Sequence, residues 1–303
     1  MTDMAAVQVP AGDGRELEVR VSGPEDGFPF IYHHGTPQGA VPCPFVERPA
    51  AHRGLRTIAY SRPGYGRSTP RTDAMTATVA ADAFDVSAIL GHLGLGEFVT
   101  LGWSGGGPRA LACAALLPDL CRAAALGVSP APPDAEDFDW MAGMGPENVA
   151  EYTAVREGPE ALTSFLQAVA PGTFSSTADG LIEGMSGVLP PVDRAALTGE
   201  VGEYLAASFR HAGHQGIVGW RDDDLTHSRP WGFDVGDITV PVSIWQGTED
   251  LMVPLAHAVW LSEHVAGAAA HLVDGEGHLS LFARLDTILD DLVERAGLKK
   301  RWS

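Results

Sequence analysis

A serine flanked by glycines is the first feature of this sequence that can do chemistry. Ser104 lies in "GWSGG", residues 102–106, between an apolar segment and a helix-like segment. This G-x-S-x-G spacing is typical of a nucleophile elbow, a tight strand-to-helix turn that exposes the serine oxygen next to backbone N–H groups. Glycine inside a helix costs about 1 kcal/mol relative to alanine. The pattern indicates a nucleophilic serine, although a glycine-rich turn with an incidental serine would give the same motif.

A nucleophilic serine needs a base and a carboxylate that orients the base. Asp250 in "GTEDLMVP" and His278 in "GEGHLS" each follow a strand-like segment. The three residues follow one another along the chain as serine, acid and histidine. This is the order of the triad residues in α/β proteins that carry such an elbow. Asp274, four residues before His278, is a second candidate for the acid, but Asp250 is better placed after a strand. We therefore predict a catalytic triad of Ser104, Asp250 and His278.

Acyl transfer also needs donors for the oxyanion of its tetrahedral intermediate. The segment "YHHGTPQG", residues 32–39, ends another strand-like run. We predict an oxyanion hole made by the backbone N–H groups of Thr36 and Gly105, since loss of one such donor typically costs about 3–4 kcal/mol. His34, beside this loop, and Trp103, beside the serine, are candidates for lining the substrate pocket.

Strand-like and helix-like segments alternate along most of the chain. Several strand-like segments are apolar throughout, which is typical of strands buried on both faces. Alternation of this kind predicts an α/β fold with a mostly parallel central sheet and helices on both faces. The predicted strands cover 16–23, 28–35, 55–64, 97–105, 121–130, 240–250 and 269–277, and the predicted helices cover 76–95, 108–120 and 279–297.

The stretch 131–235 breaks this alternation and reads as mostly helical. We expect it to form a helical lid (cap) over a core built from residues 1–130 and 236–303. The lid is strongly acidic, with 17 Asp and Glu against 5 Arg and no Lys. Glu200 and Glu203 share one helix face and are candidates for binding a cationic group of the substrate. The alternative is a solvated acidic surface.

Composition limits the classes of partner. The formal net charge is -19, which argues against nucleic acid and against an anionic membrane surface. No apolar run approaches the roughly 20 residues of a membrane helix, and the start lacks the pattern of a signal peptide. Three sparse cysteines favour a reducing compartment, so we expect a cytoplasmic protein. Neither the cysteine spacing nor the histidines of 211–227 fit a zinc site, and we expect no metal and no cofactor. The oligomeric state is left open.

Five segments together resemble the α/β-hydrolase fold enzymes of the lid-bearing type, which include esterases, proline iminopeptidases, epoxide hydrolases and haloalkane dehalogenases. The resemblance rests on "HHGTP" (33–37), "SRPGYGRS" (61–68), "GWSGGG" (102–107), "GTEDLMVP" (247–254) and "GEGHLS" (275–280). Ser61 stands where the family usually has an acid, a departure that we expect to affect loop packing and not chemistry. Serine at position 104, where epoxide hydrolases and dehalogenases have aspartate, argues against those two activities.

The resulting prediction is a serine hydrolase that acts on a small-molecule substrate, namely a small ester, thioester or lactone. A proline iminopeptidase-like aminopeptidase is the nearest alternative, because such enzymes hold a substrate amine with acidic lid residues. A perhydrolase or a C–C bond hydrolase is possible on the same triad. Outside enzymes, the alternative is a receptor that binds a ligand in the same pocket.

Overall fold

The computed structural model describes residues 6–137 and 139–298 of the chain. Its centre is an eight-stranded sheet with the strand order β1-β2-β4-β3-β5-β6-β7-β8. The pairs β1–β2 and β2–β4 are antiparallel, and every later pair is parallel. The strands are β1 (Val7–Pro10), β2 (Glu16–Ser22), β3 (Phe28–His33), β4 (Leu55–Tyr60), β5 (Phe98–Trp103), β6 (Cys121–Gly127), β7 (Val242–Gly247) and β8 (Ala269–Val273).

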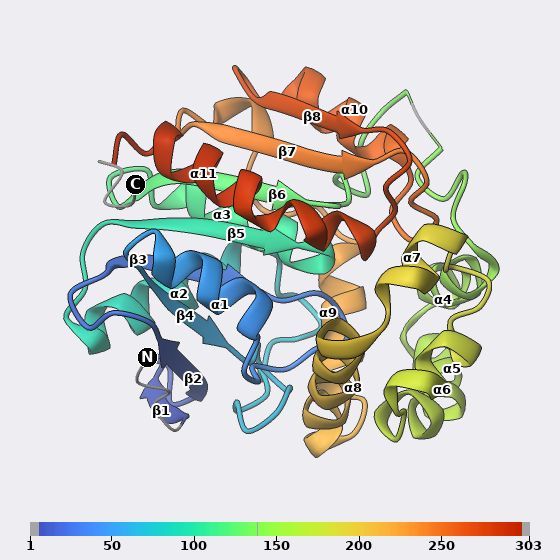
Figure 1. Ribbon diagram of the computed structural model, residues 1–303. Helices are drawn as coiled ribbons and strands as arrows, with labels where there is room; N and C mark the ends of the chain where they lie inside the picture. Colours follow the sequence, from blue (N-terminus) through green and yellow to red (C-terminus); the bar gives the residue numbers. More distant parts are fainter. Residues whose placement is uncertain (1–5, 138, 299–303) are drawn as a thin grey trace.

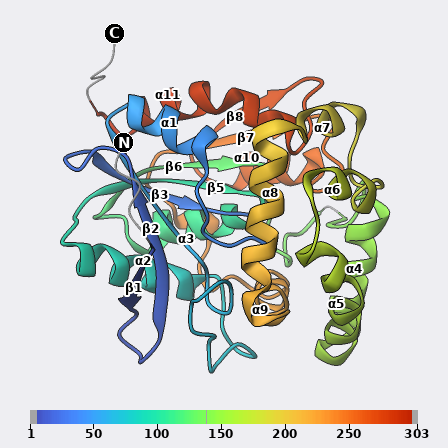
Figure 2. The ribbon, with the colours of Figure 1, turned by 60° about the horizontal axis from the view of Figure 1, so that its bottom comes forward.

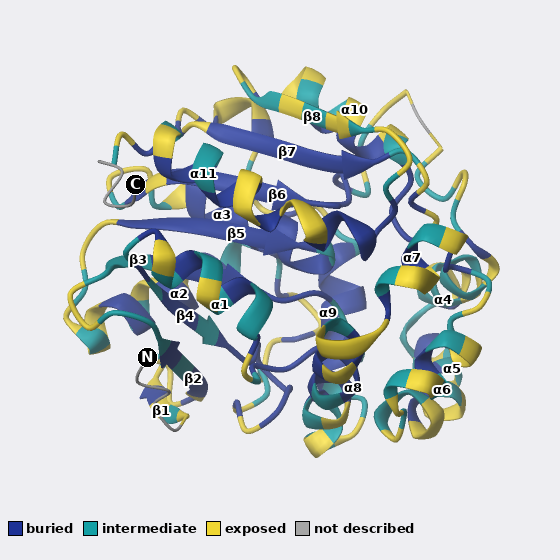
Figure 3. Ribbon diagram, in the orientation of Figure 1, coloured by how far each residue is buried: buried dark blue, intermediate teal, exposed yellow. Residues whose placement is uncertain are grey.

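Helices cover both faces of this sheet (Figure 1). On one face lie α1 (Pro44–His52) and α11 (Leu285–Arg295), and on the other lie α2 (Ala80–Leu93), α3 (Gly107–Leu116) and α10 (Leu255–His264). Every residue of β5 and β7 is buried (Figure 3), as their uninterrupted apolar runs require. The predicted architecture is therefore confirmed. Strand β1 and helices α1 and α10 were not predicted.

Between β6 and β7 the chain forms a helical segment, defined here as α4 to α9. Its helices are α4 (Pro146–Glu157), α5 (Pro159–Phe174), α6 (Ala178–Gly184), α7 (Pro191–Ala196), α8 (Gly199–Ala212) and α9 (Val218–His227). They lie beyond the carboxyl ends of the parallel strands, where α/β sheets build their sites (Figures 1 and 2). A separate apolar cluster, which includes Leu162, Leu166 and Trp220, joins α5 to α9. Within the described ranges, no helix combines the length and the apolar character needed to cross a membrane.

Candidate active site

Ser104 lies at a strained corner between β5 and α3. Its φ is +53°, a left-handed backbone conformation that costs a non-glycine residue about 1–3 kcal/mol and is kept where function uses it. The flanking glycines are required by space. A Cβ on Gly102 would collide with the carbonyl of Gly106, and a Cβ on Gly106 would collide with the carbonyl of His33. The G-x-S-x-G pattern thus has a steric cause in this fold.

His278 and Asp250 meet above the carboxyl ends of β8 and β7. His278 Nδ1 lies 2.9 Å from Asp250 Oδ2, and both side chains are buried. The other oxygen of Asp250 accepts the backbone N–H groups of Met252 and Val253, each at 2.8 Å. These donors fix the carboxylate, so that Nδ1–H of the imidazole donates to it and Nε2 is left to act as a base.

Two effects oppose each other in the titration of His278. Burial lowers the pKa of the imidazole, whereas the carboxylates of Asp250 and Asp193 raise it, and the net result is a pKa above the ordinary value. A charged imidazole is thereby stabilised, which favours transfer of a proton from a serine to His278. Asp274, the other candidate acid, instead contacts Thr248 Oγ1 at 3.4 Å and is exposed.

The strand-end loop that carries Thr36 packs directly on the serine turn. A Cβ on Gly105 would lie 2.5 Å from Thr36 Oγ1, so glycine is needed there as well. Thr36 Oγ1 donates to Asp223 on α9 at 2.7 Å. The structure thus brings the two residues of the predicted oxyanion hole together, and their role as donors stays a prediction.

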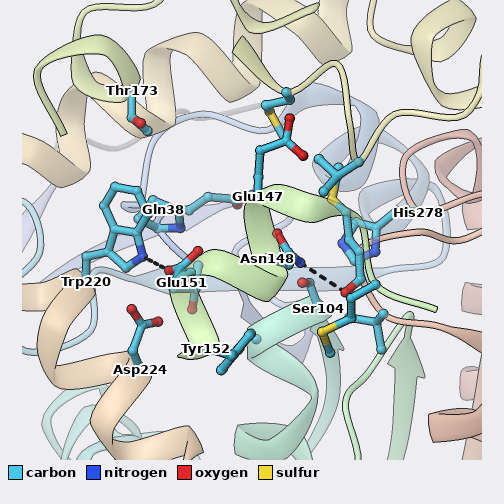
Figure 4. Close-up of a pocket in the computed structure, with 18 of the residues that line it drawn as sticks. Gln38, Ser104, Glu147, Asn148, Glu151, Tyr152, Thr173, Trp220, Asp224 and His278 are labelled. Atoms are coloured by element: carbon cyan, nitrogen blue, oxygen red, sulfur yellow. Dashed lines mark hydrogen bonds between the residues drawn. The ribbon is translucent and has the colours of Figure 1, made fainter. Parts of the chain in front are cut away.

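A cavity of about 560 Å³ lies between the sheet edge and the helical segment. Ser104 and His278 line it from the core (Figure 4). Gly105 and Thr36 line it from the same side. The rest of the lining is mostly apolar and comes from both parts of the chain: Trp103, Met144, Phe165, Val188, Leu205, Phe209, Met252 and Phe282. Trp103 stacks on Phe282 with a ring-centroid distance of 3.8 Å and lies in the cavity wall. A small, largely apolar molecule fits this space.

Three acidic residues of the helical segment line the cavity, Glu147, Glu151 and Asp224, and the last two lie close together (Figure 4). Glu151 on α4 accepts the indole N–H of Trp220 at 2.5 Å, while Asp224 Oδ2 is buried with no hydrogen-bond partner among the described residues. Figure 4 shows Trp220, Glu151 and Asp224 together, on the side of the view away from His278. Burial raises the pKa of both carboxyl groups, and the proximity of Glu151 raises the pKa of Asp224 further. The arrangement offers acceptors for a cation or for a hydrogen-bond donor on a ligand.

The next residue along the chain, Asp223, is held by the core. Its carboxylate accepts from Arg62 at 2.6 Å, from Arg109 at 2.9 Å, from Tyr65 at 3.0 Å and from Thr36. Burial alone would raise the pKa of Asp223, but the two guanidinium groups hold it far below its ordinary value. Asp223 therefore ties α9 to the loop beside the serine turn.

His227, at the end of α9, lies next to the same turn. Its Nε2 is 3.0 Å from the carbonyl oxygen of Gly105 and also contacts Arg109. Burial and the Arg109 charge lower the pKa of His227 to about 3, so the ring is neutral in the ordinary pH range. In the sequence this histidine stands out only as a metal-ligand candidate, and no local pattern predicts its place in the cavity wall.

Three predicted pocket residues lie elsewhere. His34 is buried beneath the loop, where its Nδ1 lies 2.8 Å from the carbonyl oxygen of Gly35, and it does not line the cavity. Glu200 is exposed and pairs with Arg48 at 2.5 Å, and Glu203 is exposed too. The predicted pocket positions of these residues are therefore wrong. Helix α8 turns Leu205 and Phe209 toward the cavity, and its two glutamates lie on another face.

Ser61 packs the loop after β4, as its departure from the family pattern suggests. Its hydroxyl donates to Glu18 Oε2 at 3.0 Å and accepts the N–H of Ala40 at 2.9 Å. Glu18 also lies 2.6 Å from His211 on α8. The carboxylate that the family pattern supplies in this loop is thus supplied here by β2.

Comparisons with known proteins agree with this fold. The profile of a family described as "alpha/beta hydrolase fold" matches residues 29–284. A protein named non-heme chloroperoxidase from Streptomyces lividans is 30% identical, over 94% of this chain and 97% of its own length. Among solved structures, an esterase from Exiguobacterium antarcticum has a TM-score of 0.65 at 19% identity, over 97% of this chain and all of the other. A proline iminopeptidase from Mycobacterium smegmatis has a TM-score of 0.62 at 20% identity, over 96% and 99%.

Proposed function

The chain belongs to the α/β-hydrolase fold family, and from this premise we propose that it is a serine hydrolase that cleaves a small ester, thioester or lactone. The observation that carries the proposal is that His278, paired with the buried Asp250, and Ser104, in a left-handed corner, line the same cavity. Strain at a corner of this kind has no packing benefit and is explained by exposure of a nucleophile.

In the first half-reaction, Ser104 Oγ attacks the carbonyl carbon while His278 Nε2 takes the hydroxyl proton. Asp250 stabilises the resulting imidazolium through Nδ1–H. The backbone N–H groups of Gly105 and Thr36 receive the negative charge on the former carbonyl oxygen. His278 then returns the proton to the leaving alcohol or thiol, the bond to it breaks, and an acyl-enzyme remains.

In the second half-reaction, a water molecule takes the place of the leaving group. His278 removes its proton, the hydroxide oxygen attacks the acyl carbon, and the same two N–H groups hold the oxyanion. Return of the proton to Ser104 Oγ releases the carboxylic acid and restores the enzyme. The steps need no cofactor.

In this proposal, residues 131–235 act as a lid over a catalytic core of residues 1–130 and 236–303. The helical segment forms one wall of the cavity. It is anchored to the core beside the reacting groups, since Asn148 Nδ2 donates to the carbonyl of Met252 at 3.0 Å and Gly145 N–H donates to that of Leu251 at 2.8 Å. A lid of this kind excludes bulk water and selects substrates by size and polarity.

The test is turnover of short-chain nitrophenyl esters together with covalent labelling by a fluorophosphonate. We expect wild type to be labelled and active, and Ser104→Ala to be neither, with kcat falling by roughly 10⁴-fold or more. Glu200→Gln, on the exposed surface of α8, is the matched control and should keep full labelling. Equal labelling of wild type and Ser104→Ala would refute the proposal, and labelling without turnover of any ester, thioester or lactone would favour a receptor.

A second candidate function is an aminopeptidase that resembles the proline iminopeptidases. The observation that favours it is the pair Glu151 and Asp224 in the cavity wall. Matched substrates with a free and with an acetylated α-amine should be compared in wild type, Glu151→Gln and Asp224→Asn. A preference for the free amine that both substitutions remove supports the aminopeptidase. If wild type shows no preference for the free amine, the ester hydrolase remains the proposed function.

The similarity to a protein named as a chloroperoxidase adds one arm to the ester assay. If hydrogen peroxide replaces water as the acceptor, the acyl-enzyme yields a peracid and free Ser104. Peracid formation in the presence of peroxide, lost in Ser104→Ala, would extend the proposed activity to a perhydrolase. Its absence would restrict the acceptor to water.

A further inference from the structure

A carboxylate from the helical segment binds the backbone of the loop that carries His278. Asp193 lies on α7 and is fully buried. Its Oδ2 accepts the N–H of His278 at 2.8 Å, and its Oδ1 accepts the N–H groups of Leu279 and Ser280, each at 2.8 Å. Three charge-assisted hydrogen bonds to consecutive N–H groups define the path of the main chain at these residues.

These N–H groups stand at the start of a short 3₁₀ helix, η4 (Ser280–Arg284), which leads directly into α11. Such starts leave N–H groups unpaired, and a neighbouring side chain usually caps them. The nearest hydroxyl, Ser280 Oγ, already accepts the N–H of Gly277 at 2.7 Å. Asp193 therefore supplies the cap from a position 85 residues earlier in the chain, and its negative charge suits the positive end of the helix.

The loop is shaped to admit this carboxylate. A Cβ on Gly277 would lie 2.5 Å from both carboxylate oxygens of Asp193, so only glycine leaves them room. The proximity of α7 to the loop therefore depends on one residue from each segment, Asp193 and Gly277. Sequence analysis did not single out either residue.

The two carboxylates that bind His278 act on different parts of it. Asp250 binds the imidazole at Nδ1, and Asp193 binds the main-chain N–H of the same residue. We propose that Asp193 is a positioning residue, which holds the main chain of His278 so that the imidazole stays between Asp250 and Ser104. The proposal rests on the proposed function, in which His278 is the base.

The charge of Asp193 gives this role a measurable signature. Burial lowers the pKa of His278, and the charged groups that oppose it come from two sides, Asp250 after β7 and Asp193 on α7. Removal of the Asp193 charge therefore lowers the pKa of His278. Because the base must be neutral to accept a proton, the acid limb of kcat/KM then moves to lower pH. A side chain that only attached the helical segment to the core would not shift the acid limb of kcat/KM.

The chain offers a control for that alternative. Ser208 on α8 also ties the helical segment to the core: its hydroxyl donates to the carbonyl of Gly39 at 2.8 Å and accepts the N–H of that residue at 3.1 Å. Like Asp193, it is fully buried. It makes none of the contacts of His278, so Ser208→Ala removes a buried link without changing the charge at the histidine.

The experiment compares wild type, Asp193→Asn and Ser208→Ala by two readouts. The first is an NMR titration of the His278 imidazole, assigned with His278→Gln, which requires no turnover. The second is the pH profile of kcat and KM for a small nitrophenyl ester. For Asp193→Asn we expect a lower pKa of His278, a parallel shift of the acid limb to lower pH, and a plateau kcat reduced about 10- to 100-fold, the range that misplacement of a catalytic group produces. KM should change less than twofold.

A third variant separates charge from position. Gly277→Ala displaces the Asp193 carboxylate but keeps its charge, so kcat should fall while the acid limb moves much less than in Asp193→Asn. If Asp193→Asn does not fold, an unchanged kcat in Gly277→Ala overturns the proposal and a reduced kcat supports it.

The proposal is overturned if Asp193→Asn lowers only the unfolding temperature, as Ser208→Ala should, and leaves the pKa of His278 and the acid limb where wild type has them. Failure of the proposed function looks different: wild type would then show no Ser104-dependent turnover, while the NMR titration would still report whether Asp193 acts on His278.

Discussion

Two neighbouring residues of α9, Asp223 and Asp224, lie in opposite electrostatic environments. Successive residues of a helix point about 100° apart. Asp223 therefore meets the core, where Arg62 and Arg109 bind its carboxylate, and Asp224 meets the cavity beside Glu151. The pKa of the first carboxyl is lowered and the pKa of the second is raised. The surroundings, and not the residue type, decide whether a buried carboxylate ties two segments together or is left available to a ligand.

The difference is also one of energy. A buried carboxylate with two arginines has cationic partners that compensate for its loss of water, whereas Glu151 and Asp224 raise the energy of each other's ionised form. The core-facing side of α9 should thus stabilise the fold, and its cavity-facing side should reduce stability in favour of binding. Each of the following substitutions tests one part of this contrast.

The largest effect is expected from Asp223→Asn. The substitution keeps the shape but removes the charge that Arg62 and Arg109 share, and a buried pair broken in this way costs about 3–5 kcal/mol. Chemical denaturation measures the loss. Glu203→Gln, an exposed position on α8, is the matched control. A loss below about 1 kcal/mol would mean that the arginines find other partners and that Asp223 does not anchor α9.

Acid should break the core-facing contact in wild type. The pKa of Asp223 is lower in the folded chain than in the unfolded one, so its contribution to stability is complete above the ordinary aspartate pKa of about 3.8. It is lost as the pH falls below that value. Stability curves of wild type and Asp223→Asn should therefore converge as the pH falls below about 4. Curves that stay parallel there would contradict the assignment.

The opposite sign is expected for Asp224→Asn. The substitution removes a carboxylate that burial and Glu151 disfavour, and we expect a gain in unfolding free energy on the order of 1 kcal/mol at neutral pH. Because the folded pKa of Asp224 is raised, protonation at lower pH relieves wild type of the same penalty. The gain should shrink as the pH approaches 4. A loss of stability at neutral pH would show that Asp224 supports the fold instead of reducing its stability.

The smallest effect is expected from Glu200→Gln. Its partner Arg48 is about half exposed, with a side-chain accessibility of 53%, and exposed ion pairs contribute about 0–1 kcal/mol. We expect a change of less than about 0.5 kcal/mol and no change in kcat/KM toward amine-bearing substrates. A clear change in kcat/KM toward those substrates would indicate that α8 binds the substrate amine. It would weaken the assignment of amine binding to Glu151 and Asp224.

The sequence by itself determined the sheet and the positions of the proposed reacting groups, because both depend on short-range patterns. Continuous apolar runs indicated buried parallel strands. Ser104, Asp250 and His278 each follow such a run within a few residues, and strand ends of a parallel sheet gather at one edge. The glycines around Ser104 could be interpreted in the same way, since the turn itself requires them.

Only the tertiary structure decided which acidic residues meet the site. Glu200, Asp193, Asp223 and Asp224 all lie in one acidic helical stretch, and no local pattern ranks them. Their roles depend on partners far away in the chain: Arg48 for the first, the His278 loop for the second, Arg62 and Arg109 for the third and Glu151 for the fourth. A carboxylate acquires its pKa and its task from the groups that folding places around it, and helix periodicity alone does not contain that information.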